Sequence, residues 1–515
     1  MTVSFDQIPS TLRVPLFYAE VDPSKAASGG ADLKRSLVIA QIISTGTGTP
    51  NVPVKVSSEG QAAVLGEFGS HFHRACKRYL DADPFGDLWA VPLSDNGVAF
   101  ATNTVTIGGA ATAAGTLFLY VGGQLVNRDS ATRGIPVASG DTPTIIGLAI
   151  QTALGLNAAA AAALSSPYPV IASNAVGTVT ITARNAGTLG NQIDIRANYY
   201  GAAGGEELPA GVTCTVATPK CTGGAVDPVL TTAIANMGDT EYDAIVHGYS
   251  DTTTLNALRM ELAGRWGPLR QVYGHSFSWL DAAYAGFAAI GTARNNQYET
   301  LMGIELCPMP PWEAAAAMAG AALQSLRIDP ARPLQSLEIP GILPPVEADR
   351  WTITERNTLL YDGIAQAYTS GGVLRIERAI TTWQEDDYGS PSDAMLDIQT
   401  MYTLQYILRD TKAIITSKYG RHKLADDGTR YGPGQAIVTP SVLKGELISA
   451  YMRYEEMGLV ENADIFAKLI IVERSLTDPN RVDVVYPPDL INQFRILALL
   501  AQFRLQYSAA EKAGS

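Results

Sequence analysis

The stretch YDAIVHGYSDTTTLNALRMELAGRW, residues 242–266, decides the fold class. Residues 242–247 predict a strand, and residues 254–266 predict a helix with one apolar face. That face carries, at spacings of three, four and four, Leu255, Leu258, Leu262 and Trp266. The same order then repeats, with a strand, a helix and a strand over 271–277, 280–293 and 300–306. Tandem βα units of this kind predict a parallel or mixed sheet with right-handed crossovers.

The segment upstream belongs to the same predicted domain. Residues 37–43, LVIAQII, form a continuous apolar run, which is typical of a strand buried on both faces. A helix is expected over 59–80 and a second strand over 88–91. These elements read as the start of an α/β domain.

Between these two parts, from residue 94 to residue 226, the composition shifts to Gly, Ala, Thr and Val. Turn signals such as Gly108-Gly109 separate short alternating runs, which predicts a β-rich domain with one helix over 144–156. The alternating runs cover 103–108, 116–121, 178–184, 192–197 and 212–217. Because the alternating strand and helix pattern resumes afterwards, we interpret this region as an inserted domain.

Further elements follow the tandem units. Two helices over 311–326 and 354–368 and a strand over 373–380 complete the α/β part, with Ser370-Gly371-Gly372 stopping the second helix. From about residue 390 the pattern predicts a compact α+β domain. Its elements are a helix over 394–417, a helix from Pro440 to Gly458 capped by Thr439, and strands over 465–474 and 481–486.

Both ends of the chain read as strands without a partner of their own. Near the C-terminus, Phe503, Leu505 and Tyr507 alternate with polar residues, the period of a half-buried strand. The N-terminus repeats this pattern with Leu12, Val14, Leu16 and Tyr18. Loops over 24–31 and 486–489 separate the two arms from the body. Such arms can pair with the sheet edge of a neighbouring molecule, although terminal strands can equally complete the sheet of their own domain.

Composition argues against several classes of function. The 515 residues predict about three or four domains, and 46% hydrophobic with 17% charged residues predicts a globular chain. A net charge of −13 argues against a nucleic-acid coat or a membrane-surface protein, since both need basic surface. MTVSFDQIPS, at the N-terminus, lacks signal-peptide features, and no apolar stretch reaches the length of a membrane span. We therefore expect a soluble product made in a cytoplasm.

An α/β pattern invites an enzyme hypothesis, and a hydrolase is the alternative that we carry. Phosphate-binding, dinucleotide-binding and nucleophile-elbow motifs do not occur, and no CxxC or HExxH motif signals a metal. His247 and His275 are the acid–base candidates, and each reads more simply as a structural residue. His71 and His73 point to different faces of their predicted helix. We expect no catalytic residue, no metal and no cofactor. Cys214 and Cys221 could be cross-strand neighbours, although two buried free thiols are the simpler interpretation.

A basic cluster follows the long helix predicted over 394–417. Lys418, Arg421 and Lys423 precede the turn signal Asp426-Asp427-Gly428. This pattern indicates a basic tip on a hairpin-like loop, and an ordinary solvated loop explains it as well.

Three stretches are similar to segments of one known family. ITERNTLLYDGI at 353–364 resembles a helix of that family, and GGVLRIERAITT at 371–382 resembles the strand that follows it. GTVTITARNAG at 177–187 is similar to a stretch that is common in the same family. With the order of parts, they resemble the tail sheath proteins of contractile-tailed bacteriophages, most closely those of the Mu-like kind.

The resemblance implies a multidomain fold, α/β plus α+β, with a central sheath domain of subtilisin-like topology that does not bring catalysis. The implied parts are an N-terminal arm and linker at 1–30, the sheath domain at 31–93 and 227–389, an inserted β-rich outer domain at 94–226, a C-terminal α+β domain facing the tube at 390–488, and a C-terminal arm at 489–515.

The resemblance also implies a function. Six-fold rings of subunits would stack helically around a tail tube, with arms that augment the C-terminal sheets of neighbours. Contraction of this metastable sheath would drive the tube through the host envelope for genome delivery. The implied partners are further copies of the chain, the tail tube protein, and baseplate and tail terminator proteins, without direct nucleic-acid binding or stable membrane insertion. The chain would be assembled in the bacterial cytoplasm into the virion, with Lys418, Arg421 and Lys423 against the tube.

Overall fold

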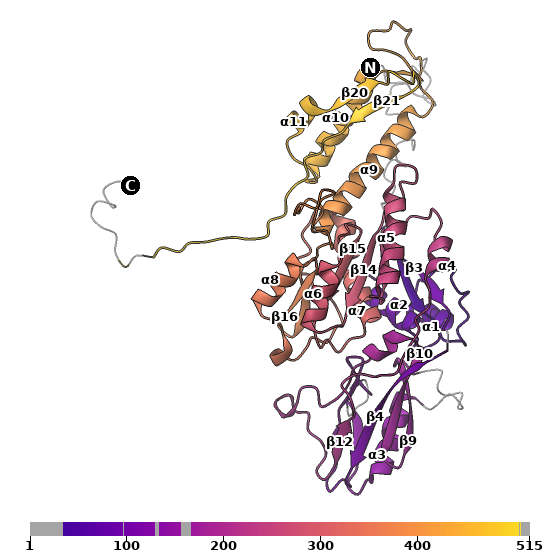
Figure 1. Cartoon of the computed structure of the whole chain (residues 1–515), viewed down its shortest axis with the longest axis vertical. Coiled ribbons are helices and arrows are strands. Elements are labelled where there is room, and N and C mark those ends of the chain that lie inside the picture. Colours follow the sequence, from indigo (N-terminus) through magenta and orange to yellow (C-terminus); the bar gives the residue numbers. More distant parts are fainter. Residues whose placement is uncertain (1–33, 96, 129–132, 156–165, 504, 506–515) are drawn as a thin grey trace, which may run out of the picture.

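The computed structural model describes residues 34–95, 97–128, 133–155, 166–503 and 505. The molecule is elongated, with a β-rich end, a central sheet flanked by helices, and a helical C-terminal end (Figure 1). The predicted arm residues outside the described ranges are Leu12, Val14, Leu16, Tyr18 and Tyr507. No helix in these ranges has an apolar stretch long enough to cross a membrane.

The centre of the molecule is a six-stranded sheet with the order β15-β14-β13-β1-β3-β2. The first five strands in that order are parallel, and β2 pairs antiparallel with β3 at the edge. The strands are β1 (Arg35–Gln41), β2 (Val54–Lys55), β3 (Asp87–Leu93), β13 (Ala244–His247), β14 (His275–Leu280) and β15 (Glu299–Gly303). This mixed sheet confirms the α/β class that the tandem βα units predict.

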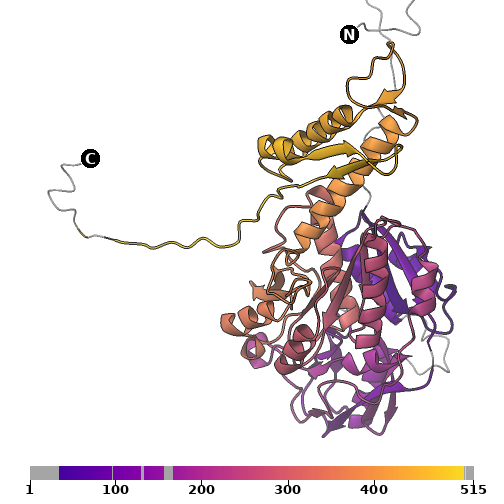
Figure 2. The same cartoon turned by 45° about the horizontal axis from the view of Figure 1, so that its top comes forward.

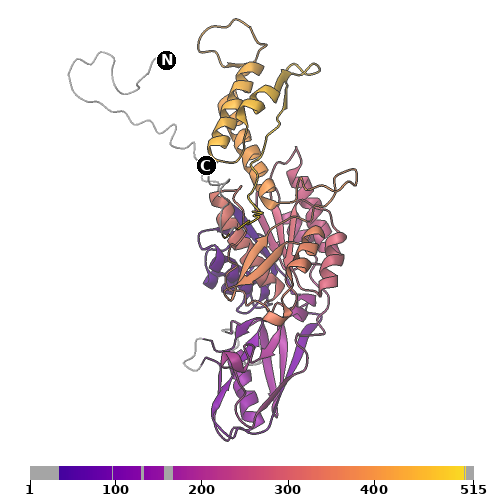
Figure 3. The same ribbon diagram turned by 90° about the vertical axis from the view of Figure 1, so that its left-hand side faces the viewer.

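Helices cover both faces of this sheet (Figure 3). α2 (His71–Ala82) and α7 (Pro311–Ile328) pack on one another, and between them they contact β1, β13 and β14. α5 (Thr252–Trp266) and α6 (Tyr284–Thr292) connect β13, β14 and β15 over the opposite face. The chain order therefore reverses between β1 and β13, which are neighbours in the sheet.

The helix predicted over 59–80 is wrong in its continuity. The chain instead forms α1 (Glu59–Gly66) and α2, separated by a turn. Gly69 in that turn has φ +75°, and a Cβ atom there would collide with the carbonyl oxygen of Tyr168 in the β-rich region. Contact with a segment about 100 residues away breaks the helix, and sequence periodicity does not report such a contact.

Residues 100–216 form the β-rich end of the molecule. A four-stranded antiparallel sheet has the order β12-β4-β10-β9, and α3 (Pro143–Leu154) packs against it. A three-stranded sheet, β11-β6-β7, and the pair β5-β8 complete this end. The strands are β4 (Phe100–Gly108), β5 (Gly115–Leu117), β6 (Leu119–Val121), β7 (Gln124–Leu125), β8 (Ile135–Val137), β9 (Val170–Ala175), β10 (Thr178–Ala186), β11 (Ile195–Ala197) and β12 (Thr213–Val216).

The chain enters and leaves this β-rich end side by side. Ala99 pairs with Ala225, and Thr102 pairs with Thr222, in isolated antiparallel bridges. After α4 (Thr231–Asn236) the chain returns to the central sheet at β13. Paired entry and exit strands are the geometry that an insertion into one domain requires.

A smaller group of elements lies beside β15 of the central sheet, where Met302 and Ala365 form an isolated parallel bridge. It consists of α8 (Ile353–Tyr361), β16 (Gln366–Ser370) and β17 (Val373–Arg378). The helix predicted over 354–368 is wrong beyond Tyr361, since the chain turns at Gly363 with φ +77° and then forms a hairpin. A Cβ atom at Gly363 would crowd the backbone of Thr382, so the turn depends on close packing.

The C-terminal end has its own small core. Its elements are α9 (Ile398–Tyr419), β18 (Lys423–Leu424), β19 (Ile437–Val438), α10 (Pro440–Glu456), α11 (Ala463–Leu469), β20 (Ile471–Arg474) and β21 (Val482–Val485). The strand predicted over 465–474 is wrong in its first half, which belongs to α11. Phe466 stacks on Tyr451 of α10, with ring centroids 3.8 Å apart, and this burial favours the helix.

The long helix α9 joins this small core to the central sheet. The Tyr402 hydroxyl donates to the carbonyl oxygen of Asp243, 2.7 Å away, at the start of β13. Arg409 Nη2 lies 2.8 Å from the Asp243 carboxylate and 2.7 Å from that of Glu241. The Asp243 side chain also accepts from the backbone N–H of Arg35 at 2.9 Å. The two parts are therefore linked through one buried carboxylate.

Candidate assembly surfaces

The carboxyl ends of β1 and β13 are the position where an open α/β sheet usually binds a ligand. Here the end of β10 fills that position. Gln41 Nε2 donates to the carbonyl oxygen of Ala186 at 2.8 Å, and Asn185 Nδ2 donates to that of Ile42 at 3.0 Å. The Tyr249 hydroxyl donates to Gln41 Oε1 at 3.4 Å. The crevice is thus occupied by the protein's own backbone.

Both acid–base candidates are buried structural residues. His247 Nε2 lies 3.0 Å from Ser276 Oγ, and His275 Nε2 lies 2.8 Å from Thr300 Oγ1. Burial lowers the pKa of His247 to about 4 and that of His275 to about 3, so both rings are neutral at pH 7. Asp251, the nearby carboxylate, caps α5 by accepting from the Thr254 N–H at 2.9 Å. These residues do not form a nucleophile–base–acid set.

The other polar candidates are equally structural. His71 stacks on Trp312 with ring centroids 3.8 Å apart, and burial lowers its pKa to about 3. All four cysteines are free thiols. Among the described residues, no group of three or more His, Cys, Asp and Glu side chains is placed to hold a metal ion.

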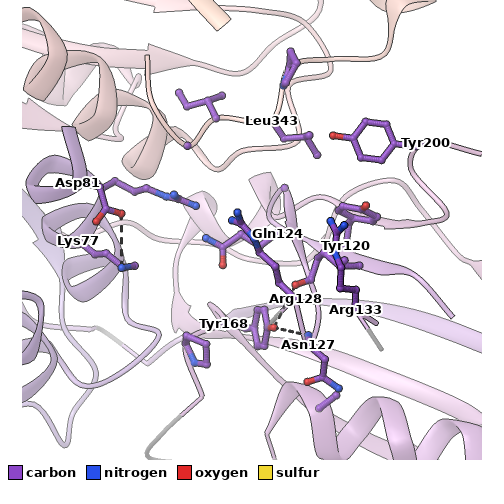
Figure 4. Close-up of a pocket in the computed structure, with 18 of the residues that line it drawn as sticks. Lys77, Asp81, Tyr120, Gln124, Asn127, Arg128, Arg133, Tyr168, Tyr200 and Leu343 are labelled. Atoms are coloured by element: carbon purple, nitrogen blue, oxygen red, sulfur yellow. Dashed lines mark hydrogen bonds and ion pairs between the residues drawn. The ribbon is translucent and has the colours of Figure 1, made fainter. Parts of the chain in front are cut away.

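A cavity of about 880 Å³ lies where α2 meets the β-rich end (Figure 4). Lys77 on its wall pairs with Glu59 at 2.8 Å and with Asp81 at 3.7 Å. Tyr168 accepts from the Asn127 N–H at 2.9 Å. Apart from Leu343 in the loop at 341–344, the remaining labelled side chains are polar or aromatic and come from α2 and the β-rich end. The cavity is a polar junction between two parts of the chain.

The sheet of the C-terminal core has open edges. β20 and β21 pair antiparallel, and within the described residues no further strand joins either of them. An apolar groove of about 340 Å³ adjoins β21. It is lined by Leu408, Thr411, Ile415, Leu443, Leu447, Val482, Val484 and Tyr486. Val482, Val484 and Tyr486 share one face of β21, so the groove continues the core beyond the sheet edge.

The C-terminal arm leaves the body later than the sequence predicts. The predicted linker at 486–489 is packed, with Tyr486 5.0 Å from the Phe466 ring and Asp489 accepting from Asn462 Nδ2 at 2.8 Å. Beyond Arg495 the chain projects from the molecule without secondary structure in its described part (Figure 2). Phe503 and Leu505 are 86% and 97% exposed there.

The predicted basic tip starts with Lys418 in the last turn of α9, at the end of that helix that points away from the central sheet (Figure 1). Lys418 pairs with Glu446 of α10 at 2.5 Å, Lys423 Nζ lies 3.3 Å from Gln435 Oε1, and Arg421 is exposed. The hairpin-like loop is wrong, because β18 and β19 pair in parallel. The three cations share one end of the molecule.

Comparison with known proteins defines the class of this molecule. Residues 223–382 match the family model of the phage tail sheath protein central domain, and residues 390–504 match that of the phage tail sheath C-terminal domain. The chain is 38% identical, over 509 residues, to the Mu-like prophage FluMu tail sheath protein of Haemophilus influenzae. That alignment covers 98% of this chain and 100% of the relative.

Solved structures of sheath tail proteins are similar at low identity. The protein from Desulfitobacterium hafniense has a TM-score of 0.45 and 13% identity, covering 93% of this chain and 100% of that one. The protein from Listeria innocua has a TM-score of 0.47 and 12% identity, covering 91% and 95%. A chain of the contracted anti-feeding prophage baseplate has a TM-score of 0.45 and 13% identity, covering 96% and 100%.

The chain therefore belongs to the phage tail sheath protein family, and its similarity to the FluMu protein places it among the Mu-like members. It is a structural subunit of a contractile tail sheath and a component of the phage tail, not an enzyme. The resemblance found in the sequence is confirmed, and the hydrolase alternative is not supported.

Proposed function

We propose that the chain polymerises by strand exchange between copies, in six-fold rings that stack helically around a tail tube. The central sheet is its subtilisin-like sheath domain at 31–93 and 227–389. Residues 94–226 form the inserted outer domain, residues 390–488 the inner domain, and residues 1–30 and 489–515 the arms. Baseplate and tail terminator proteins cap the polymer, and its contraction drives the tube through the host envelope.

The observation that carries this proposal is the open edge of the β20–β21 sheet beside an apolar groove. An unpaired edge offers backbone N–H and C=O groups to an added strand. The alternation of Phe503 and Leu505 suits this site, because one face of the strand would lie on Leu408 and Ile415 while the backbone pairs with β21. The N-terminal arm, with Leu12, Val14, Leu16 and Tyr18, has the same alternation and suits the other edge.

The gain from one exchanged strand is large enough to hold copies together. Each backbone hydrogen bond contributes about 0.5–1.5 kcal/mol net. Burying an exposed Phe or Leu side chain contributes about 1.5–3 kcal/mol more. Phe503 and Leu505, both almost fully exposed in the single chain, lose most of that exposure on docking.

Removal of residues 496–515 tests the proposal. The truncated chain keeps every described contact of the body up to Arg495, so we expect a folded monomer that forms no tubes. Electron microscopy and light scattering across a concentration series measure assembly, and circular dichroism checks the fold. Tubes of normal width from the truncated chain would refute strand donation by this arm.

We further propose that the C-terminal core faces the tail tube, with Lys418, Arg421 and Lys423 as the contacting cations. The argument is charge contrast, since the chain as a whole carries −13 while three cations gather at this tip. Replacing all three by Glu should weaken co-assembly with the tube protein, and more so at low salt, where charges are less screened. Unchanged co-sedimentation with tubes at low salt would contradict this contact.

A further inference from the structure

The point at which the C-terminal arm leaves the body is marked by one partly buried arginine. Arg495 is only 15% exposed in its side chain, whereas the residues after it are open to solvent. Exposure exceeds 70% for the apolar residues Ile496, Leu497, Leu499 and Leu500. The boundary between bound and free chain therefore falls at a single residue.

Arg495 is held by side chains from two distant segments. Its Nη2 donates to Asp397 Oδ1 at 2.9 Å and to Gln399 Oε1 at 3.2 Å, at the start of α9. Its Nη1 lies 3.4 Å from Gln335 Oε1, and Gln335 Nε2 donates to the carbonyl oxygen of Phe494 at 3.1 Å. We call Arg495 with Gln335, Asp397 and Gln399 the arm clamp.

Backbone pairing holds the segment just before the arm clamp. Val460 and Leu490 form an antiparallel bridge, and the Ile491 N–H donates to the carbonyl oxygen of Leu459 at 3.2 Å. The Tyr451 hydroxyl accepts from the Asp489 N–H at 3.0 Å. The chain is thus held by contacts between residues 489 and 495. Among the described residues, the arm clamp is the last of these contacts before the chain enters solvent.

We propose that Arg495 is a positioning residue for strand donation: the arm clamp fixes where the donor strand starts and the direction in which it leaves. This inference rests on the proposed strand exchange and adds the residue that controls it. An arm whose first residue is held in place loses less conformational entropy on docking than an arm whose first residues are also free to move. Its register on the neighbour is also restricted, because the number of free residues before Phe503 is set.

The arm clamp can be opened without breaking the fold. Asp397 also accepts from Arg378, at 3.0 and 2.9 Å, so it keeps a partner when Arg495 is replaced. The two guanidinium groups share that single carboxylate, and removing one of them relieves their mutual repulsion. Arg495→Gln is therefore expected to leave a folded body with a loose arm root.

Hydrogen exchange and assembly of the full-length chain test the proposal together. Below the assembly concentration, Arg495→Gln should speed amide exchange in peptides over 489–495 and leave α9 and α10 unchanged. The critical concentration for tube formation should rise at least about tenfold, because each freed backbone residue must be ordered again on docking. Unchanged exchange over 489–495 would overturn the clamp, and so would faster exchange with an unchanged critical concentration.

Matched variants separate this inference from strand exchange itself. Arg259→Gln removes the same charge from an exposed arginine on α5, outside the β20–β21 sheet and its groove, and should change neither readout. Gln335→Ala removes the contact to Phe494 without a charge change and should act in the same direction as Arg495→Gln. Assembly that survives deletion of 496–515 would refute strand exchange. Loss of assembly on that deletion, with normal assembly of Arg495→Gln, would refute only the positioning role.

Discussion

At the scale of single residues, the most consequential buried group is Glu313 of α7. Its carboxylate is fully buried between Arg74 and Arg78 of α2, 2.7 and 2.9 Å away. Glu313→Gln leaves both cations facing a neutral amide, and breaking a buried ion pair costs about 3–5 kcal/mol. We expect a loss of that size in denaturant unfolding of unassembled chain.

The pH dependence of this site has a defined sign. Burial alone would raise the pKa of Glu313, but the neighbouring Arg74 and Arg78 outweigh burial and hold it below 4.5. The stabilisation is complete above pH 4.5 and is lost as the pH falls through the folded-state pKa.

Glu338→Gln is the control for Glu313→Gln. It removes a carboxylate from an exposed pair with Arg375 and should cost at most about 1 kcal/mol of unfolding free energy. Equal losses from the two variants would contradict the argument.

The sequence favours structural roles for His247 and His275, because each lies in or beside an apolar strand and lacks a neighbouring catalytic motif, and both side chains are buried in the structure. The sequence does not predict that Asp243, Arg409 and Arg495 form hydrogen bonds and ion pairs between different parts of the molecule. The partners described above come from segments 96 to 208 residues away, and pairs at such separations leave no periodic signal.

At the scale of elements, the apolar groove beside β21 is the surface on which the proposed strand exchange depends. Leu408 and Ile415 lie on the α9 wall of the groove, and Leu408 is already 40% exposed. Leu408→Asp with Ile415→Asp would place charges where a donated strand must bury its apolar face. We expect tube formation to be lost while the circular dichroism spectrum stays that of the parent.

Met260 provides a matched control for the groove variant. Its side chain is 73% exposed, and it lies on α5, which covers the central sheet and does not line the groove. Met260→Asp should assemble as the parent does. Normal tubes from the doubly substituted groove variant would show that no strand docks along α9.

Element boundaries show which physical information a sequence carries. The strands at 37–43 and 242–247 follow from apolar runs and are confirmed in β1 and β13. The breaks at Gly69 and Gly363 are set by close contacts with Tyr168 and Thr382, which lie outside the helices that end there. The first half of the strand predicted over 465–474 is instead the α11 helix, in which Phe466 packs on Tyr451.

At the scale of the whole molecule, the β-rich end is attached to the central sheet by polar contacts across their junction. Lys220 forms an ion pair with Asp281, whose side chain is 3% exposed. Arg74 Nη1 donates to the carbonyl oxygen of Pro167, and Arg196 Nη2 donates to that of Leu306. These contacts connect the β-rich end to the central sheet in addition to its entry and exit strands, which lie side by side.

Replacing residues 100–224 by a short Gly-Ser linker tests both the attachment and the outward placement of this region. The linker can join Ala99 to Ala225, which already pair, but it leaves the Asp281 carboxylate buried without Lys220. We expect a lower melting temperature than the parent, with partial recovery when Asp281→Asn removes the unpaired charge. A deletion variant with the melting temperature of the parent would show that the junction contributes nothing to the stability of the body. If the rescued variant folds, it should still form tubes, because the proposed strand exchange uses the opposite end of the molecule. Failure of that folded variant to assemble would place the β-rich end inside the contacts between copies.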